Sequence, residues 1–521
     1  MLDSHNTLPN PPAVLALTDR TPWQRGASLR VLAVGLGLLV FAGSAEAQTT
    51  DDTAVVISDL RRQIRAQQQQ LDAQGRQLAS QAELLDRLAS RQVPAAPPQR
   101  ASSPGNAQPD EIAVVPSAEI KAVATADVTL PELTADRFAA GPGVVVVDMP
   151  GFKATLGGAL RTNALFSSAR GIGGSAAPFF LAPPDATGAE NVFDITAQYS
   201  QVNLSLEGPS VGGFSTGALV LFQFYNGAVF SNQYGFTPGL VFAYAANERW
   251  NVSAGRRGEL FSDRAPNMVD AMTILGASGN PGNSVRSQFR VVHTTPMADG
   301  GKFTAALAIS DPISTNISAD FADRTEDNGV PNFEAKLAFA TSPPGSEVLL
   351  KRPVFEIGIS GVYGEFRKFY DLQPPFSVEK YSIEGLALDG GLRLGDRFGL
   401  QGEIYQGRGL GNYLGLANQT VNPQSREIVT GSGGWGEASW VWREGLESNF
   451  GYGQDRPDLD TISLGSIGRN ETAYGNLIWT VRPWLRLSAE TTWRKTGYLL
   501  PTKSLLSNDG LGLNLATEMR F

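Results

Sequence analysis

The sequence contains no cysteine and only two histidines, His5 and His293, in 521 residues. The absence of cysteine excludes disulfides, thiolate nucleophiles and cysteine-ligated zinc, and two histidines are too few for a histidine-rich metal site. Hydrolysis by a Ser-His-Asp triad needs a histidine base held by a carboxylate. His5 lies in a segment that we expect to be removed, and His293 lies on the apolar side of an alternating segment. We therefore expect no enzyme activity, no metal and no cofactor.

Long apolar runs and positive charge are also scarce. After residue 47 no apolar run approaches the roughly 20 residues that a membrane-spanning helix needs, so any insertion into a membrane must use strands. The formal net charge is -9, which argues against nucleic acid as a partner. Glycine is abundant, with 57 residues, and so are aromatic side chains, with 26 Phe, 12 Tyr and 8 Trp. This composition favours an all-β structure with frequent turns.

Residues 1–47 have the features of a secretory signal peptide. Three arginines precede the apolar run VLAVGLGLLVFA at 31–42, and the small residues around Ala47 form a cleavage site. A membrane anchor is the alternative, but this run is too short to span a bilayer comfortably. We predict that the chain is exported and cleaved after Ala47.

Residues 48–92 carry a heptad pattern, which predicts a coiled-coil helix, with a lone solvated helix as the alternative. The second seam position of the heptad holds glutamine in the middle of the segment, which weakens a coiled coil but can fix its register. Residues 93–150 are rich in proline and small residues and lack periodicity, which predicts a disordered linker. The first seam position of the heptad holds Ile57, Ile64, Leu71, Leu78 and Leu85.

Residues 151–521 consist of alternating segments separated by turns. At the C-terminus, NLATEMRF places Leu515, Thr517, Met519 and Phe521 on one side and polar residues on the other, as in a half-buried strand. Many segments reach ten residues or more, a length that suits tilted membrane strands. A soluble β-sandwich is the alternative fold, but its strands are usually shorter. We count sixteen segments, which begin near 153, 191, 214, 235, 249, 284, 302, 331, 353, 379, 397, 430, 445, 469, 484 and 508.

The connections between these segments alternate in length. Short turns such as GDR and REGLE contrast with long connections at 258–283, 313–330 and 409–429. Short turns at one rim and long loops at the other predict an all-β fold, a 16-stranded antiparallel transmembrane β-barrel of the bacterial outer membrane. An even strand number places both termini on the periplasmic side, so the helix at 48–92 becomes a periplasmic stalk, with peptidoglycan as a candidate contact. We interpret a phase break near Tyr199 as a β-bulge.

A barrel of this size encloses a water-filled lumen, which predicts a porin for passive diffusion of small hydrophilic solutes. Alternation directs six arginines inward, and the connection at 258–283 carries three acidic residues that we expect opposite them. A basic wall facing an acidic loop forms a constriction, and an excess of arginine there favours small organic anions, carboxylates in particular. The predicted pore-lining residues are Arg161, Arg257, Arg286, Arg290, Arg486, Arg494, Glu259, Asp263 and Asp270.

Other interpretations stay open at this stage. In one, the arginines pair with inward glutamates such as Glu490 and take no part in selecting solutes. In a second, the barrel is an envelope tether whose working part is the stalk. An outer-membrane hydrolase is the third and least supported class.

Three stretches carry a resemblance to a known family: FDITAQYSQVNLSLEGP at 193–209, SAGRRGELFSD at 253–263 and VRSQFRVVHTTPM at 285–297. With the order of stalk, spacer and barrel, they resemble the DcaP-like trimeric outer-membrane porins. Where that family tends to carry a Thr-Trp pair, this chain has Arg256 and Arg257. The resemblance implies a homotrimer in outer-membrane lipid that admits small organic anions, with dicarboxylates and aromatic acids as family examples. Phe521 resembles the outer-membrane assembly signal, which implies recognition by the barrel-assembly machinery.

Overall fold

The structure is a computed structural model. The predicted signal peptide, the coiled-coil helix and the linker up to residue 143 lie outside the part of the chain that it describes. No helix in the described part is long and apolar enough to cross a membrane. The described residues are 144–172, 178–184, 191–225, 234–270, 275–282, 284–297, 300–312, 324–327, 329–341, 349–370 and 377–521.

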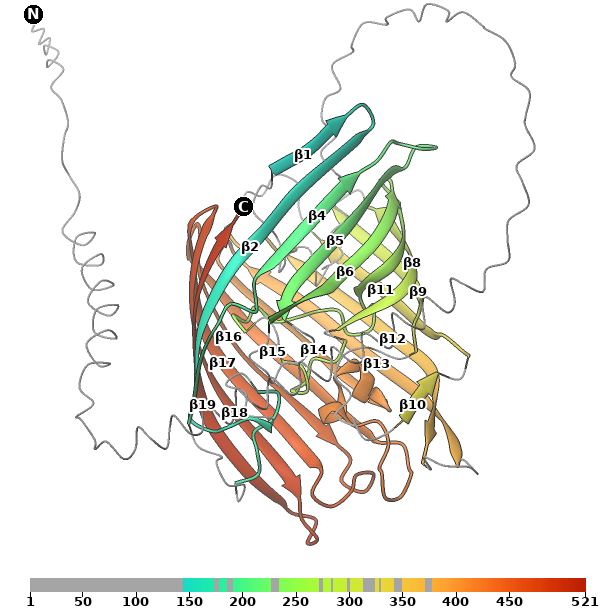
Figure 1. The fold of residues 1–521 in the computed structure, drawn as a ribbon, viewed down its shortest axis with the longest axis vertical. Coiled ribbons are helices and arrows are strands. Elements are labelled where there is room, and N and C mark those ends of the chain that lie inside the picture. Colours follow the sequence, from blue (N-terminus) through green and yellow to red (C-terminus); the bar gives the residue numbers. More distant parts are fainter. Residues whose placement is uncertain are drawn as a thin grey trace, which may run out of the picture. The chain divides into compact units, whose positions relative to one another are not determined.

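These residues form one antiparallel sheet of nineteen segments, with two short 3-10 helices (Figure 1). The segments are β1 (Val144–Met149), β2 (Phe152–Ser167), β3 (Val192–Thr196), β4 (Gln201–Glu207), β5 (Ser215–Tyr225), β6 (Tyr234–Ala246), β7 (Trp250–Gly258), β8 (Val285–Pro296), β9 (Gly301–Ser310), β10 (Arg324–Asp327), β11 (Asn332–Thr341), β12 (Phe355–Phe369), β13 (Val378–Leu394), β14 (Phe398–Arg408), η3 (Leu410–Tyr413), η4 (Leu416–Asn418), β15 (Thr430–Arg443), β16 (Leu446–Pro457), β17 (Ile467–Arg482), β18 (Leu485–Leu499) and β19 (Leu505–Arg520).

The sheet closes on itself because the last strand, β19, pairs with β2 along nine residue pairs, from Gly512↔Ser167 to Arg520↔Ala159. Both β3 and β4 pair with β2, and both β10 and β11 pair with β12, so each couple is one barrel strand in two pieces. β1 is an additional arm that pairs with β2 outside the β19 contact. The barrel therefore has sixteen strands, and the predicted closed antiparallel barrel is confirmed.

The wall separates an apolar exterior from a polar interior, as the alternation of the sequence predicts. On β18, Glu490, Thr492 and Arg494 face inward and are buried. His293 lies on the outward phase, where its ring packs 4.3 Å from that of Trp250. Outward-facing apolar side chains that are more than half exposed include Phe193, Phe289, Leu307, Ile404 and Leu511.

The two ends of the barrel differ as predicted. The end with the short connections 247–249, 395–397 and 444–445 also holds the C-terminus, and we call it the turn end. The opposite loop end carries the long connections that include residues 259–284 and 409–429. Fifteen of the sixteen barrel strands begin within three residues of the predicted positions, and the strand predicted to begin near 331 begins earlier, with β10 at Arg324.

Three details differ from the sequence interpretation. Residues 144–149, predicted as linker, form β1, which continues the row of β19 along the edge of β2. The expected bulge near Tyr199 is an interruption at 197–200, where Ser200 Oγ accepts a hydrogen bond from the Arg161 amide. Part of the long connection at 313–330 forms β10. This segment pairs with the end of β12 that lies nearer the loop end of the barrel.

Phe521 completes the closure of the barrel. Its backbone N–H donates to the Gly158 carbonyl at 3.1 Å and its carbonyl accepts from the Gly158 N–H at 3.0 Å. Its ring lies over Gly158, so closely that a Cβ added there would stand 2.7 Å from Phe521 Cζ. An aromatic ring that covers a glycine on a neighbouring strand is a known way to stabilise a sheet at such a position.

Candidate functional site

We call the connection between β7 and β8, residues 259–284, the inserted loop, because its described residues lie inside the barrel. Its described residues contact inward-facing side chains from β11 around to β18, and Val269 O accepts a hydrogen bond from Arg161 of β2. Leu260, Phe261 and Leu275 have no exposed surface. The described residues of the inserted loop therefore follow the inner wall around much of its circumference and occupy part of the lumen.

Wall side chains hold this loop mainly through its backbone. Glu334 of β11 accepts from the N–H groups of Leu260 and Phe261, at 2.6 and 3.3 Å. Glu490 of β18 accepts from the N–H groups of Val269 and Asp270, at 2.7 and 3.1 Å. A carboxylate that accepts two amide hydrogens makes short, charge-assisted hydrogen bonds. The same kind of contact is made by Ser360 with Ser262 N, by Glu437 with Asn267 N and by Asp455 with Gly279 N.

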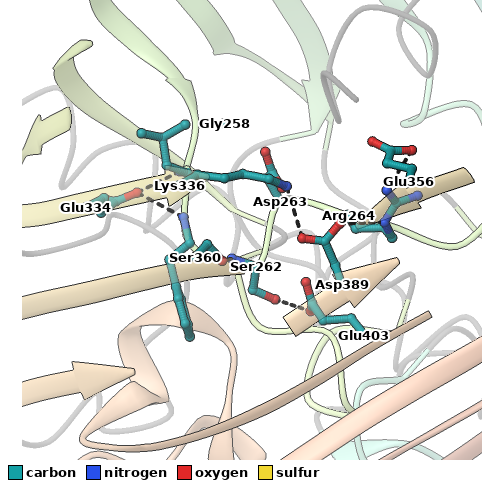
Figure 2. Close-up of polar contacts among 12 residues, drawn as sticks. Gly258, Ser262, Asp263, Arg264, Glu334, Lys336, Glu356, Ser360, Asp389 and Glu403 are labelled. Carbon is teal, nitrogen blue, oxygen red and sulfur yellow. Dashed lines mark hydrogen bonds and ion pairs between the residues drawn. The ribbon is translucent and has the colours of Figure 1, made fainter. Parts of the chain in front are cut away.

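Two buried cation sites tie the loop to the wall through side chains. Arg264 of the loop lies between Glu356 and Asp389, at 2.8 Å from each (Figure 2). Lys336 of β11 reaches Asp263 of the loop and is 3.1 Å from Asp389. All these charged side chains are at least nine-tenths buried. Removal of one partner would leave a buried charge without compensation, which costs about 3–5 kcal/mol of stability.

Residues 409–429, between β14 and β15, form a second element inside the loop end, which we call the capping loop. Its residues Leu410, Tyr413 and Leu416 are completely buried in one apolar cluster with Phe261 of the inserted loop. The Tyr413 hydroxyl donates to Glu334 Oε1 at 3.3 Å, and its ring meets that of Phe261 edge-on at 5.7 Å. The two loops thus share one core, and the position of either depends on the other.

Between Leu414 and Asn418 the backbone of the capping loop adopts left-handed conformations at four residues with side chains. Leu414, Leu416, Ala417 and Asn418 have φ between 51° and 60°. Each such residue costs roughly 1–2 kcal/mol, with less for asparagine. The surrounding apolar cluster must offset this strain, which is of the kind found at clamps and switches.

Four of the six predicted arginines are buried by contacts with the loops and the wall. Arg286 Nε is 2.7 Å from Glu259 Oε1 and its guanidinium lies 4.3 Å from the Tyr413 ring centre. Arg494 is 3.2 Å from Asp270. Arg257 donates to Ser253 Oγ at 2.7 Å, and Arg290 donates to Gln288 and to the Gly258 carbonyl. Arg286 and Arg494 thus meet two of the predicted acidic loop residues directly, and the third, Asp263, meets Lys336 instead.

The other two predicted arginines gather at a different place. Arg161 and Arg486 lie 3.7 and 4.0 Å from Glu518, and Arg520 Nε lies 2.6 Å from the same carboxylate. The side chains of Arg161, Arg486 and Arg520 remain 11, 23 and 17% exposed. Three guanidinium groups that share one carboxylate carry excess positive charge. We call Arg161, Arg486, Arg520 and Glu518 the arginine cluster.

Several residues of this site were not among the predicted ones. Glu334 and Lys336 stand at inward positions of NFEAKLAFAT, so alternation could have identified them. Arg520 falls on the polar side of NLATEMRF, so alternation could have identified it as well. Nothing in the sequence indicates that Glu490 would hold loop amides rather than an arginine, since its partners are backbone groups.

We expect the inserted loop to be held more firmly at pH 5 than at pH 7.5. Burial raises the pKa of Glu259 to about 6 from 4.5, with Arg286 opposing the shift and Glu334 adding to it. At a pH between these two values Glu259 binds a proton in the docked loop but not in a released loop. The ratio of docked to released loop therefore rises as the pH falls through 6, by roughly tenfold. Current fluctuations of single channels should therefore be rarer at pH 5.

The control for this expectation is Glu259→Gln, which removes the titrating group but keeps its size and one acceptor oxygen. Its fluctuation frequency should change less between the two pH values than that of the unaltered channel. More frequent fluctuations of the unaltered channel at pH 5 would contradict the expectation.

The fold has relatives among solved structures. The chain is similar to the outer membrane channel DcaP of Acinetobacter baumannii, with 14% identity, a TM-score of 0.54, and coverage of 72% of this chain and 99% of that one. It also matches an anion-selective porin from Comamonas acidovorans, with 11% identity, a TM-score of 0.45, and coverage of 71% of this chain and 100% of that one. No family model and no curated protein matches the sequence. The first similarity confirms the predicted resemblance at the level of the fold.

Proposed function

We propose that this chain is a bacterial outer-membrane porin for passive diffusion of small hydrophilic solutes, with small organic anions favoured. The observation that carries the proposal is a closed sixteen-stranded wall, apolar outside and polar inside, with the inserted loop held against its inner face. A barrel of this strand number encloses an aqueous channel rather than a packed core. A loop that narrows the channel and carries charge is what selection among solutes requires.

The same proposal assigns an orientation and partners. The β1 arm and Phe521 lie at the turn end, which we place in the periplasm. The exposed apolar exterior fits outer-membrane lipid. A homotrimer, recognition of Phe521 by the barrel-assembly machinery and contact of the periplasmic stalk with peptidoglycan complete the proposal.

Anion preference is supported by the arginine cluster. Three cations around Glu518 leave two positive charges in excess, at side chains that keep exposed surface. One charge 4 Å from a solute carboxylate is worth about 4 kcal/mol near a protein surface, and about 1 kcal/mol in bulk water. Arg286, which has no exposed side-chain surface, acts instead on the position of the loop.

Replacement of Arg486 and Arg520 with glutamine is expected to lower the anion-to-cation permeability ratio, because it removes two of the three exposed cations near Glu518. The measurement is the reversal potential of the purified full chain in a planar bilayer under a salt gradient. The matched control is Arg443→Gln, which removes the same charge at the same end of the barrel but on its outer face, where Arg443 lies over Trp479. An unchanged reversal potential in the double variant would exclude the cluster as the source of selectivity.

An envelope tether is the second candidate, and one observation favours it. The inserted and capping loops bury many lumen-facing side chains, as a structural barrel that conducts nothing would do. Swelling of liposomes in isosmotic sugar or salt separates the two, since only a porin makes the liposomes swell. A tether would leave them impermeable.

A further inference from the structure

A cavity of about 300 Å³ lies at the turn end of the lumen, between the inserted loop and the wall of β15 to β18. Asn267 and Met268 of the inserted loop form one side of it, and Arg486 and Arg520 of the arginine cluster form another. This volume is at the lower end of the range for small-molecule pockets. The cavity can hold a molecule the size of a short organic acid.

The lining of this cavity has a cationic side and an apolar side. Arg520 donates a hydrogen bond to Glu518, Arg486 lies 4.0 Å from the same carboxylate, and both arginines keep exposed surface. Met268 and Ile478, both buried, present apolar side chains to the same space. A ligand that fits both sides has an anionic head and a short apolar body.

One acidic residue limits the charge of that ligand. Glu447 lines the cavity from β16, directly opposite Ile478 of β17 in the strand register. With Arg161, Arg486 and Arg520 against Glu518 and Glu447, the group carries a net charge of one positive unit. One carboxylate balances that charge, whereas a second would add a negative charge that the group does not balance and that Glu447 repels.

We propose that this cavity is a binding site for monocarboxylates with a short apolar body, and that it discriminates against dicarboxylates of the same length. This inference rests on the proposed porin function and names the solute class that binds within its lumen. The carboxylate lies at Arg486 and Arg520, where charge-assisted hydrogen bonds are available. The hydrocarbon chain lies along Met268 and Ile478, where its burial is favourable.

Pentanoate and glutarate test this directly, because both have five carbons and differ only in the second carboxylate. We expect pentanoate to reduce the chloride current of the full chain in a planar bilayer in a saturable manner at pH 7.5. Glutarate should need a concentration higher by about tenfold, which corresponds to one unfavourable charge contact. Equal potency of the two acids, or stronger inhibition by glutarate, would overturn the proposal.

The variant Glu447→Gln should change the preference in a defined direction. Loss of this carboxylate raises the net charge of the group by one unit, so glutarate should approach pentanoate in potency. Arg443→Gln on the outer face is the matched control and should leave both acids as they were. If Glu447→Gln changes neither acid, Glu447 does not set the charge preference and the proposal fails.

A second measurement separates this inference from the proposed function. Titration calorimetry of the purified full chain in detergent reports binding of pentanoate without any need for conduction. If the protein makes liposomes permeable but binds no pentanoate, the porin function is supported and the binding site is contradicted. If the protein binds pentanoate in preference to glutarate but never conducts, the binding site is supported and the porin function is contradicted.

Discussion

Deletion of Phe521 is expected to lower the amount of folded barrel in the outer membrane by about tenfold or more. The deletion removes the two backbone hydrogen bonds with Gly158 and uncovers that glycine on the outer face. Backbone groups left unpaired against lipid cost several kcal/mol each, and about 1.4 kcal/mol is a factor of ten. The measurement is the fraction of the protein that shifts in electrophoretic mobility on heating.

Two substitutions sharpen this experiment. Gly158→Val should reproduce much of the defect, because its side chain would occupy the space of the Phe521 ring and approach Gln201 O, 2.7 Å from an added Cβ. Met519→Ala is the control, since Met519 also faces outward near the C-terminus but covers no glycine. A deletion strain with normal amounts of folded barrel would show that closure does not depend on the last residue.

Refolding into lipid vesicles without any assembly factor separates the two roles of Phe521. If the residue acts through closure of the barrel, the deletion variant should also fail to fold in this purified system. If it acts only as a signal to the assembly machinery, refolding should be normal and the defect should appear only in cells. The geometry at Gly158 leads us to expect a defect in both.

Replacement of residues 410–428 by a short glycine-serine linker is expected to raise the single-channel conductance severalfold. The change removes Leu410, Tyr413 and Leu416 from the apolar cluster and leaves Phe261 of the inserted loop without its partner. It also removes the Asn412 carbonyl that accepts from Arg286. The inserted loop then loses contacts on its loop-end side, so the passage should widen and the current should fluctuate more.

A matched control is replacement of residues 501–503, an exposed turn at the same end that contributes nothing to the apolar cluster. Its conductance should equal that of the unaltered chain. A smaller change at the capping loop, Tyr413→Phe, keeps the ring against Arg286 and removes only the hydroxyl. We expect an intermediate phenotype, and an unchanged conductance in the full replacement would show that the capping loop lies outside the conducting path.

The barrel wall was predictable because lipid and water impose opposite demands on its two faces. Strand β19 illustrates this, since Leu511, Leu513 and Leu515 face outward and alternate with inward residues in the middle of the strand. Strand β1 was not predicted, because its sequence lacks this alternation. Its sequence VVVVDM has no alternation and follows a proline-rich stretch, so only its pairing with β2 identifies it.

The interior was less predictable than the wall. Alternation correctly directed Arg161, Arg286 and Arg494 inward, but it does not specify which acidic group each one meets. That choice depends on the path of the inserted loop. The path in turn depends on hydrogen bonds to its amides, and every residue except proline has an amide, so the sequence carries no signature of it.

The backbone contacts of the inserted loop also bear on how such a protein diverges. Glu334 and Glu490 hold atoms that every loop sequence possesses, so the anchoring points survive changes in the loop's side chains. Asn267, Met268 and their neighbours can then change during evolution while the anchoring residues of the wall stay the same. Under the proposed function, such changes would alter which solutes the channel admits. An engineer can use the same division of labour by grafting new loop residues between fixed anchors.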